Sequence, residues 1–125
     1  MTQEDKELLI KDLCTRLPYG VKVNNEIQGD FVIYGVCENY VFARTINNHA
    51  DFHIENIKPY LFPLSSMTEE QKMFLKQQNW CIAISTSGTV ETTIEGIDWL
   101  NKNHFDYRGL IESDLAIDAT NLNIY

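Results

Sequence analysis

The sequence has few basic residues and no long apolar run, and each shortage excludes a class of protein. Only 10 lysines and arginines stand against 18 aspartates and glutamates, for a net charge of −8 at pH 7. A protein that binds DNA or RNA through the phosphate backbone needs a basic surface, so we expect no such binding here. No segment approaches the roughly 18–20 consecutive apolar residues of a membrane-spanning helix, so we expect no membrane partner.

Cysteine is also scarce. Cys14, Cys37 and Cys81 are odd in number and widely spaced, which argues against a disulfide framework or a zinc site. Each has apolar neighbours, which predicts reduced thiols buried in a core. The first fifteen residues alternate charged with apolar side chains, unlike the basic start and unbroken apolar stretch of a secretory signal. These features predict a cytoplasmic protein.

What the sequence does contain predicts one folded domain over residues 1–125. This length is close to the commonest domain size of roughly 100–150 residues, and a hydrophobic fraction of 44% is enough for a core. Thr2-x-x-Asp5 has the form of a helix capping box, and Leu9 and Leu13 follow at helical spacing. We therefore expect a helix over about 3–16.

A period of two replaces the helical period between residues 21 and 57. Short strands are expected at 21–23, 31–36, 40–44 and 51–54, separated by turn formers such as Asn24-Asn25. Strands this short, joined by tight turns, predict a small curled antiparallel sheet. Two forms stay open, an SH3-like barrel and a flat meander covered by the first helix.

The second half of the chain predicts more helix. Helices are expected at about 67–78 and 90–103, with a strand at 80–84, a loop at 85–88 and an irregular tail that lies across the core to residue 125. The predicted fold class is therefore α+β.

Three stretches carry a resemblance to a known family: Leu-Pro-Tyr-Gly-Val-Lys-Val at 17–23, Ile-Lys-Pro-Tyr-Leu-Phe-Pro-Leu-Ser-Ser-Met at 57–67, and Trp-Leu-Asn-Lys-Asn-His-Phe-Asp-Tyr-Arg-Gly-Leu-Ile at 99–111. In this order they resemble small uncharacterised proteins of phages, prophages and mobile elements of anaerobic gut bacteria. Members often close with a Leu-Ala-Leu-x-Ala-Pro-like tail, and the corresponding residues 115–120 lack the proline. The resemblance implies an accessory protein of a mobile element, and it supplies no activity, cofactor or catalytic residue.

The first candidate site is a run of alternating polar residues. His49, Asp51, His53 and Glu55 alternate with apolar residues, so on a strand they project from one face, roughly 6.5–7 Å apart. Imidazole and carboxylate groups are ligands for zinc or a similar divalent ion. The simpler interpretation is the wet outer face of a half-buried strand, which produces the same alternation.

The second candidate site follows the last predicted helix. His104 and Asp106 stand two residues apart and suit an acid–base pair, while Arg108 suits bidentate binding of a phosphate or carboxylate. Together with Tyr107 they form a candidate site for a ligand or a protein partner.

The alternative for this segment is a structural cluster. Arg108 would then pair with Asp106 or Asp98, the neighbouring aromatic rings would pack inward, and Gly109 would supply a turn conformation. Residues 85–89 precede the last helix and cap it in the simplest interpretation, since they lack the lysine and second glycine of a phosphate-binding loop.

No catalytic motif is recognisable, and no cofactor is expected. The leading hypothesis is a non-enzymatic accessory protein of a phage or mobile element that acts by protein–protein contact and inhibits or modulates a host protein. Residues 91–125 carry 7 acidic and 2 basic residues, a concentration that favours a partner with a basic surface. The alternatives are a small-ligand protein that sequesters a nucleotide or signal molecule and, more weakly, a metal-dependent hydrolase.

Overall fold

The computed structural model describes residues 1–80, 83–84 and 90–125 and confirms the α+β class. The helices are α1 (Gln3–Arg16), α2 (Glu69–Gln77) and α3 (Ile94–Lys102), with single 3-10 turns at Leu17–Tyr19, Ile54–Asn56 and Leu64–Ser66. The strands are β1 (Lys22–Asn25), β2 (Gly29–Cys37), β3 (Tyr40–Arg44), β4 (His49–His53), β5 (Lys58–Pro63), β6 (Ala83–Ile84), β7 (Val90–Glu91), β8 (Phe105–Asp106) and β9 (Ile117–Asp118).

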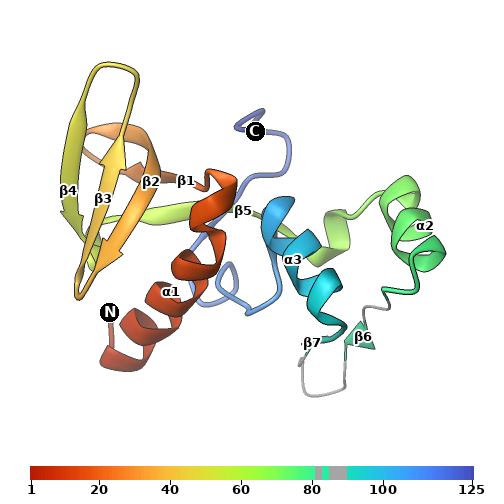
Figure 1. The fold of residues 1–125 in the computed structure, drawn as a ribbon. Helices are drawn as coiled ribbons and strands as arrows, with labels where there is room; N and C mark the ends of the chain where they lie inside the picture. Colours follow the sequence, from red (N-terminus) through yellow and green to blue (C-terminus); the bar gives the residue numbers. More distant parts are fainter. Residues whose placement is uncertain (81–82, 85–89) are drawn as a thin grey trace.

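The main sheet is open. Its strands lie in the order β4-β3-β2-β1-β5-β8, and β9 also pairs with β5. Strands β1 to β5 pair antiparallel, whereas β8 and β9 run parallel to β5. The SH3-like barrel is therefore not confirmed, and the meander covered by a helix describes β1–β4 better. Figure 1 shows these four strands with α1 beside them, and α3 and α2 beyond α1.

Helix α1 forms as the sequence predicts. The Thr2 hydroxyl accepts a hydrogen bond from the Asp5 amide at 3.1 Å, and the Asp5 carboxylate accepts one from the Thr2 amide. Leu9 and Leu13 are fully buried against the inward residues of the sheet. Those inward residues alternate along the strands as Val23, Phe31, Ile33, Val41, Ala43 and Phe52.

Two of the boundaries that differ from the sequence prediction are set by side chains that cap the backbone. The expected break at Asn24-Asn25 is wrong, since both residues belong to β1. The Asn25 side-chain oxygen accepts the amides of Ile27 and Gln28 and so forms the turn one residue later. The last helix begins at Ile94 rather than near residue 90, because Thr93 caps it.

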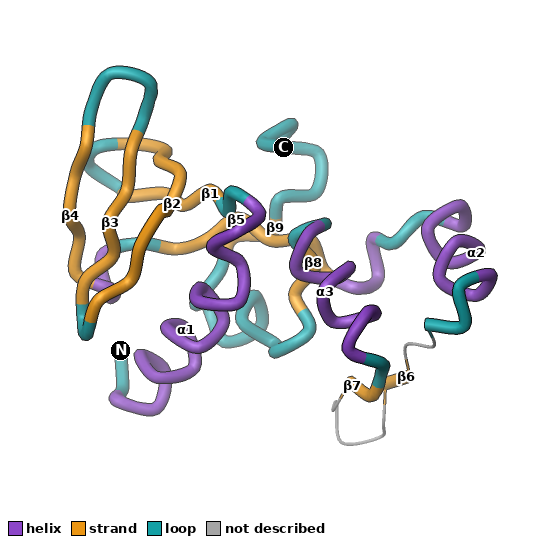
Figure 2. The backbone as a smooth tube through the Cα atoms, in the orientation of Figure 1, coloured by secondary structure: helices purple, strands orange, loops and turns teal. Residues whose placement is uncertain are grey.

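The predicted tail is more ordered than expected. Residues 105–106 and 117–118 form β8 and β9, both paired with β5 (Figure 2). The expected strand at 80–84 is described only for Ala83–Ile84, which pairs with β7. Cys81 and the loop expected at 85–88 lie outside the described residues.

The prediction of buried thiols is wrong for the two cysteines that the structure describes. Cys14 and Cys37 are both exposed and unbonded. Cys14 lies off the buried stripe of α1, and Cys37 faces outward opposite Tyr40 at the end of β2. An apolar neighbour along the chain does not bury a residue in a helix or strand, because successive side chains point to different faces. None of the described helices is long and apolar enough to cross a membrane.

Candidate functional site

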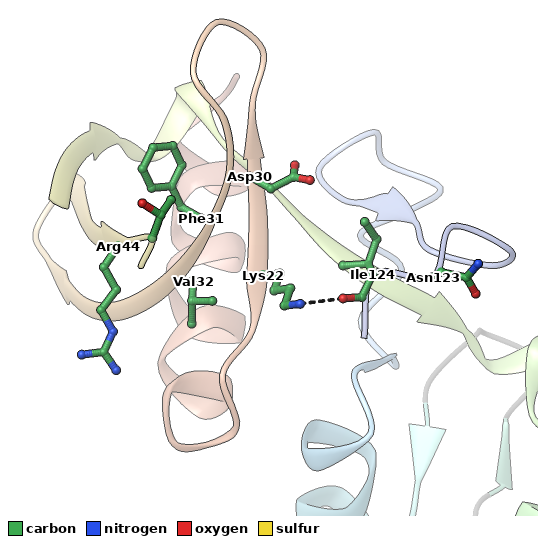
Figure 3. A pocket seen from close by; sticks show the side chains of 8 residues that line it. Lys22, Asp30, Phe31, Val32, Arg44, Asn123 and Ile124 are labelled. Carbon is green, nitrogen blue, oxygen red and sulfur yellow. Dashed lines mark hydrogen bonds between the residues drawn. The ribbon is translucent and has the colours of Figure 1, made fainter. Parts of the chain in front are cut away.

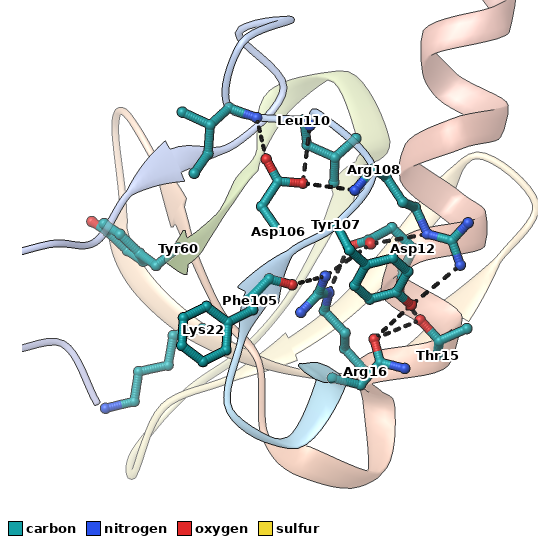
Figure 4. A network of polar contacts seen from close by, with 12 residues as sticks. Asp12, Thr15, Arg16, Lys22, Tyr60, Phe105, Asp106, Tyr107, Arg108 and Leu110 are labelled. Atoms are coloured by element: carbon teal, nitrogen blue, oxygen red, sulfur yellow. Dashed lines mark hydrogen bonds and ion pairs between the residues drawn. The ribbon is translucent and has the colours of Figure 1, made fainter. Parts of the chain in front are cut away.

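The predicted site residue Arg108 belongs to a buried ionic cluster that begins on α1. Asp12 and Arg16 are both 0% exposed, and the Arg16 Nε donates to the Asp12 carboxylate at 2.7 Å. Arg108 Nε donates to the same carboxylate at 3.2 Å (Figure 4). Arg16 also donates to the carbonyl of Phe105 at 2.7 Å. One buried carboxylate thus joins two guanidinium groups and ties α1 to the chain after α3.

Tyr107 completes this cluster. Its ring lies between the two guanidinium groups, with Arg16 at 5.3 Å and Arg108 at 4.9 Å from the ring centroid. Its hydroxyl donates to the side chain of Asn101 at 2.8 Å, which also accepts from Thr15. The ring and the hydroxyl both have partners inside the protein.

Asp106 has a different partner from the one expected. It accepts the backbone amides of Arg108, Leu110 and Ile111 at 3.2, 3.1 and 2.9 Å. Asp106 therefore closes the loop around Gly109, whose φ of 74° is the turn conformation expected for that glycine. The prediction that Arg108 pairs with Asp106 or Asp98 is wrong, since Asp12 takes that guanidinium.

These contacts give the segment after α3 a structural explanation. The carboxylate of Asp106 is occupied by backbone amides, and the guanidinium of Arg108 is held by Asp12 and Tyr107. Arg108 thus joins the loop to α1, and Asp106 closes the loop on itself. The structure does not join His104 to Asp106 by any hydrogen bond between described residues, so they form no acid–base pair there.

His104 occupies a separate environment. It is 9% exposed, has a φ of 63°, and stacks on the ring of Tyr125 with the centroids 3.6 Å apart. Burial lowers the pKa of His104 to about 4, and the charges of Arg16 and Lys22 act in the same direction. The imidazole is therefore neutral at pH 7, and its buried Nδ1 has no hydrogen-bond partner among the described residues.

Tyr125 also enters the main sheet. The pairing of β1 with β5 matches Val23 with Pro59, so Lys22 and Tyr60 would form the next pair. The Tyr125 hydroxyl lies between them, accepting from the Lys22 amide and donating to the Tyr60 carbonyl, each at 2.8 Å. Burial raises the pKa of Tyr125, which keeps this hydroxyl protonated. One side chain thus replaces a direct backbone pair between the two strands.

The predicted metal ligands His49, Asp51 and His53 lie on the outer face of β4, where the two imidazoles pack against aromatic rings. His53 packs on Tyr40 with the centroids 4.4 Å apart, and His49 meets Tyr34 edge-on at 5.8 Å. Glu55 lies beyond the strand and pairs with Lys6. Within the described ranges, no three His, Cys, Asp or Glu side chains come close enough to hold a metal ion.

No helix of the described residues covers the outer face of β1–β4, whose residues follow the strand register. Lys22, Val32, Arg44 and His49 form one row across the four strands. A cavity of about 360 Å³ opens beside the row, where Lys22 donates to the Ile124 carbonyl at 2.6 Å (Figure 3). The next positions carry aromatic rings and Asp51, which faces Phe42. This face is therefore aromatic with charges at fixed places.

Strand β4 ends the sheet and leaves one edge open. The Thr45 amide donates to the Asn48 carbonyl and the Ile54 amide to the Asn39 carbonyl, which fixes the alternation of the β3–β4 ladder. In that alternation the backbone groups of His49, Asp51 and His53 point away from β3. β4 pairs with no other strand in the part of the chain that the structure describes.

Sequence reasoning missed Asp12 and Arg16, the centre of the ionic cluster. Their spacing to Leu9 and Leu13 was the available signal, because positions 9, 12, 13 and 16 lie on one helical face. A charged pair inside an apolar stripe indicates a buried ion pair that needs a further partner. The third member of the ionic cluster, Arg108, is distant from Asp12 in the sequence.

The comparisons with known proteins add no family. No family model, curated protein or solved structure matches this chain.

Proposed function

We propose that this protein is a non-enzymatic binding module that takes an extended segment of a basic partner protein onto the open edge of β4. The observation that carries the proposal is the row of β4 backbone groups that pair with no other described strand, beside an aromatic face that no described helix covers. Extended peptides bind to such edges by adding a strand, with main-chain hydrogen bonds for affinity and side-chain contacts for specificity.

The basic character of the partner follows from the side chains next to the edge. Asp51 is exposed and has no ion-pair partner within the described ranges. Phe42 lies opposite it on β3 and Tyr40 lies diagonally from it, and aromatic faces attract guanidinium and ammonium groups. Arg44 already lies over Tyr34 in this way, 5.4 Å from its centroid. A lysine or arginine of the partner would occupy the equivalent position beside Asp51.

The distribution of charge supports the same partner. Apart from the buried Asp106, all the acidic side chains of residues 91–125 are exposed. A net charge of −8 speeds the approach of a basic partner at low salt. Arg44 and Lys22 would repel a basic side chain from the His49 end of the face, which sets the register.

The setting of this module in a phage or mobile element rests on the sequence resemblance alone. In that setting the partner would be a host protein that the module inhibits or modulates. Strand addition suits inhibition, because a bound segment is held extended and removed from its own interactions.

His53 offers a direct test of strand addition. Its φ of −62° already fits proline, and its amide points to the open edge rather than into the ladder with β3. His53→Pro therefore removes one edge donor without removing a hydrogen bond of the fold. His53→Ala is the matched control, because it loses the same imidazole and keeps the amide.

The probe is a displayed library of random peptides of about 12 residues, long enough to cover a short strand. We expect the wild-type protein to enrich peptides with lysine or arginine at alternate positions. Their binding should survive His53→Ala, weaken with Asp51→Asn and be lost with His53→Pro. Failure to enrich any peptide, or equal binding by the proline and alanine variants, would refute strand addition at β4.

A further inference from the structure

A second cavity, of about 460 Å³, lies at the other end of the main sheet between β5, the start of α2 and the end of α3. Its apolar wall is aromatic. The ring of Phe62 lies 6.1 Å from Phe105 and 6.0 Å from Tyr125, centroid to centroid. This size falls within the range of about 300–1,000 Å³ typical of small-molecule sites. The wall would accept a flat ring.

His104 lines the same cavity and has an unmet hydrogen-bonding requirement. The side chain is nine-tenths buried, and its Nδ1 has no partner. Buried polar atoms in folded proteins nearly always have a partner, so the unpartnered nitrogen of a residue that lines the cavity indicates a missing one. The neutral imidazole offers one donor and one acceptor.

Two amide side chains form the rim of the cavity and keep groups available. Gln71 uses its oxygen to accept the Thr68 amide at 2.9 Å, and its NH₂ group donates to no other described residue. Asn103 uses its NH₂ group to donate to the Trp99 carbonyl at 2.9 Å, which leaves its oxygen as an acceptor. A ligand with donors and acceptors on the edge of a flat ring matches this rim, and a nucleobase has such an edge.

Lys102 adds a positive charge at the mouth of the cavity. It is exposed, and the ion pairs between described residues do not include it. A lysine ammonium beside an aromatic cavity is a suitable partner for a phosphate or carboxylate group.

We propose that this cavity binds a nucleoside monophosphate. The base lies against the aromatic wall with its edge toward Gln71 and Asn103, and the phosphate pairs with Lys102. The imidazole of His104, which lines the cavity, supplies a further hydrogen bond. This site is separate from the β4 edge, and neither proposal depends on the other.

Titration of the labelled protein with AMP, GMP, CMP and UMP tests the site by NMR. We expect at least one nucleotide to shift the imidazole signals of His104. Lys102→Gln should weaken that nucleotide about tenfold, the typical loss for one charge-assisted hydrogen bond. Lys76→Gln is the matched control, since Lys76 is also an exposed helical lysine and does not line the cavity.

The unphosphorylated nucleoside and inorganic phosphate separate the two parts of the ligand. We expect each to bind more weakly than the nucleotide, and the nucleoside to be insensitive to Lys102→Gln. Unchanged His104 signals with all four nucleotides would overturn the proposal. Equal losses in Lys102→Gln and Lys76→Gln, or phosphate binding as tightly as the nucleotide, would also overturn it.

Discussion

Replacing the buried Asp12 by asparagine tests whether one carboxylate holds α1 to the segment after α3. The Asp12→Asn side chain has nearly the same size, so it leaves the packing in place and removes only the charge and one acceptor. Arg16 Nε and Nη2, at 2.7 and 3.1 Å, and Arg108 Nε, at 3.2 Å, would then face a neutral amide. The amide NH₂ group would also point its hydrogens at one of these donors.

The magnitude follows from burial. Both Asp12 and Arg16 are 0% exposed, so the remaining guanidinium has no access to water. Removing one partner of a buried ion pair destabilises a protein by about 3–5 kcal/mol. The total free energy of unfolding of a domain is about 5–15 kcal/mol, so this loss is a large fraction of it.

Urea denaturation measures the effect. With a slope of about 2 kcal/mol per molar urea, the midpoint should fall by about 1.5–2.5 M. Arg108→Gln should cost less, about 1–3 kcal/mol, because Asp12 keeps Arg16 as its partner. Asp114→Asn is the control for an exposed pair, since the Asp114 carboxylate pairs with Lys58 at 89% exposure and should contribute at most about 1 kcal/mol.

The order of the three variants decides the argument. Loss of less than about 1 kcal/mol in Asp12→Asn would refute the idea that the buried charge ties the two segments together, since breaking such a pair normally costs several times more. A larger loss of stability in Arg108→Gln than in Asp12→Asn would show that Asp12 is not the centre of the cluster.

Three further predictions use the same measurements. Tyr125→Phe removes the hydroxyl between Lys22 and Tyr60 and should cost about 1–3 kcal/mol in urea denaturation; the Lys22 amide loses its acceptor, so its hydrogen exchange should become faster. Folding lowers the pKa of His104 from 6.5 to about 4, so between these pH values the imidazole is protonated in the unfolded chain and neutral in the folded protein. The free energy of unfolding therefore falls as the pH drops from 6.5 to 4, and His104→Gln should lose that part of the pH dependence. Asp106→Asn should cost about 1–3 kcal/mol in urea denaturation, because an amide side chain cannot accept hydrogen bonds from all three backbone amides. Unchanged stability in Tyr125→Phe or Asp106→Asn, or an unchanged pH dependence in His104→Gln, would contradict the role given to that residue.

Local patterns in the sequence were sufficient for much of the fold. The capping box at Thr2 and Asp5 formed as predicted, because a cap depends only on residues three apart. Strand β3 has its predicted bounds at 40–44, and its alternation of exposed and buried residues is visible in the letters. The position of the turn after β1 was not predictable in the same way, because it depends on which Asn side chain accepts the backbone amides.

The candidate site was less predictable, because its partners come from distant segments. The sequence identified Arg108 as a residue with an important charge, and its structural alternative included an ion pair. It did not identify Asp12, which is 96 residues away. The glycine turn at 109 was predicted correctly, since a left-handed turn depends on one residue.

The sequence by itself determined the α+β class, α1 with its cap, most strands of the antiparallel sheet and the excess of negative charge, because these depend on neighbours within a few residues or on composition. Tertiary structure alone decided that the sheet stays open at β4, that Asp12 gathers Arg16 and Arg108, and that the Tyr125 hydroxyl separates Lys22 from Tyr60. Each of these contacts requires the chain to bring together groups far apart in sequence. Which groups meet depends on how the whole core packs, and no local pattern encodes that outcome.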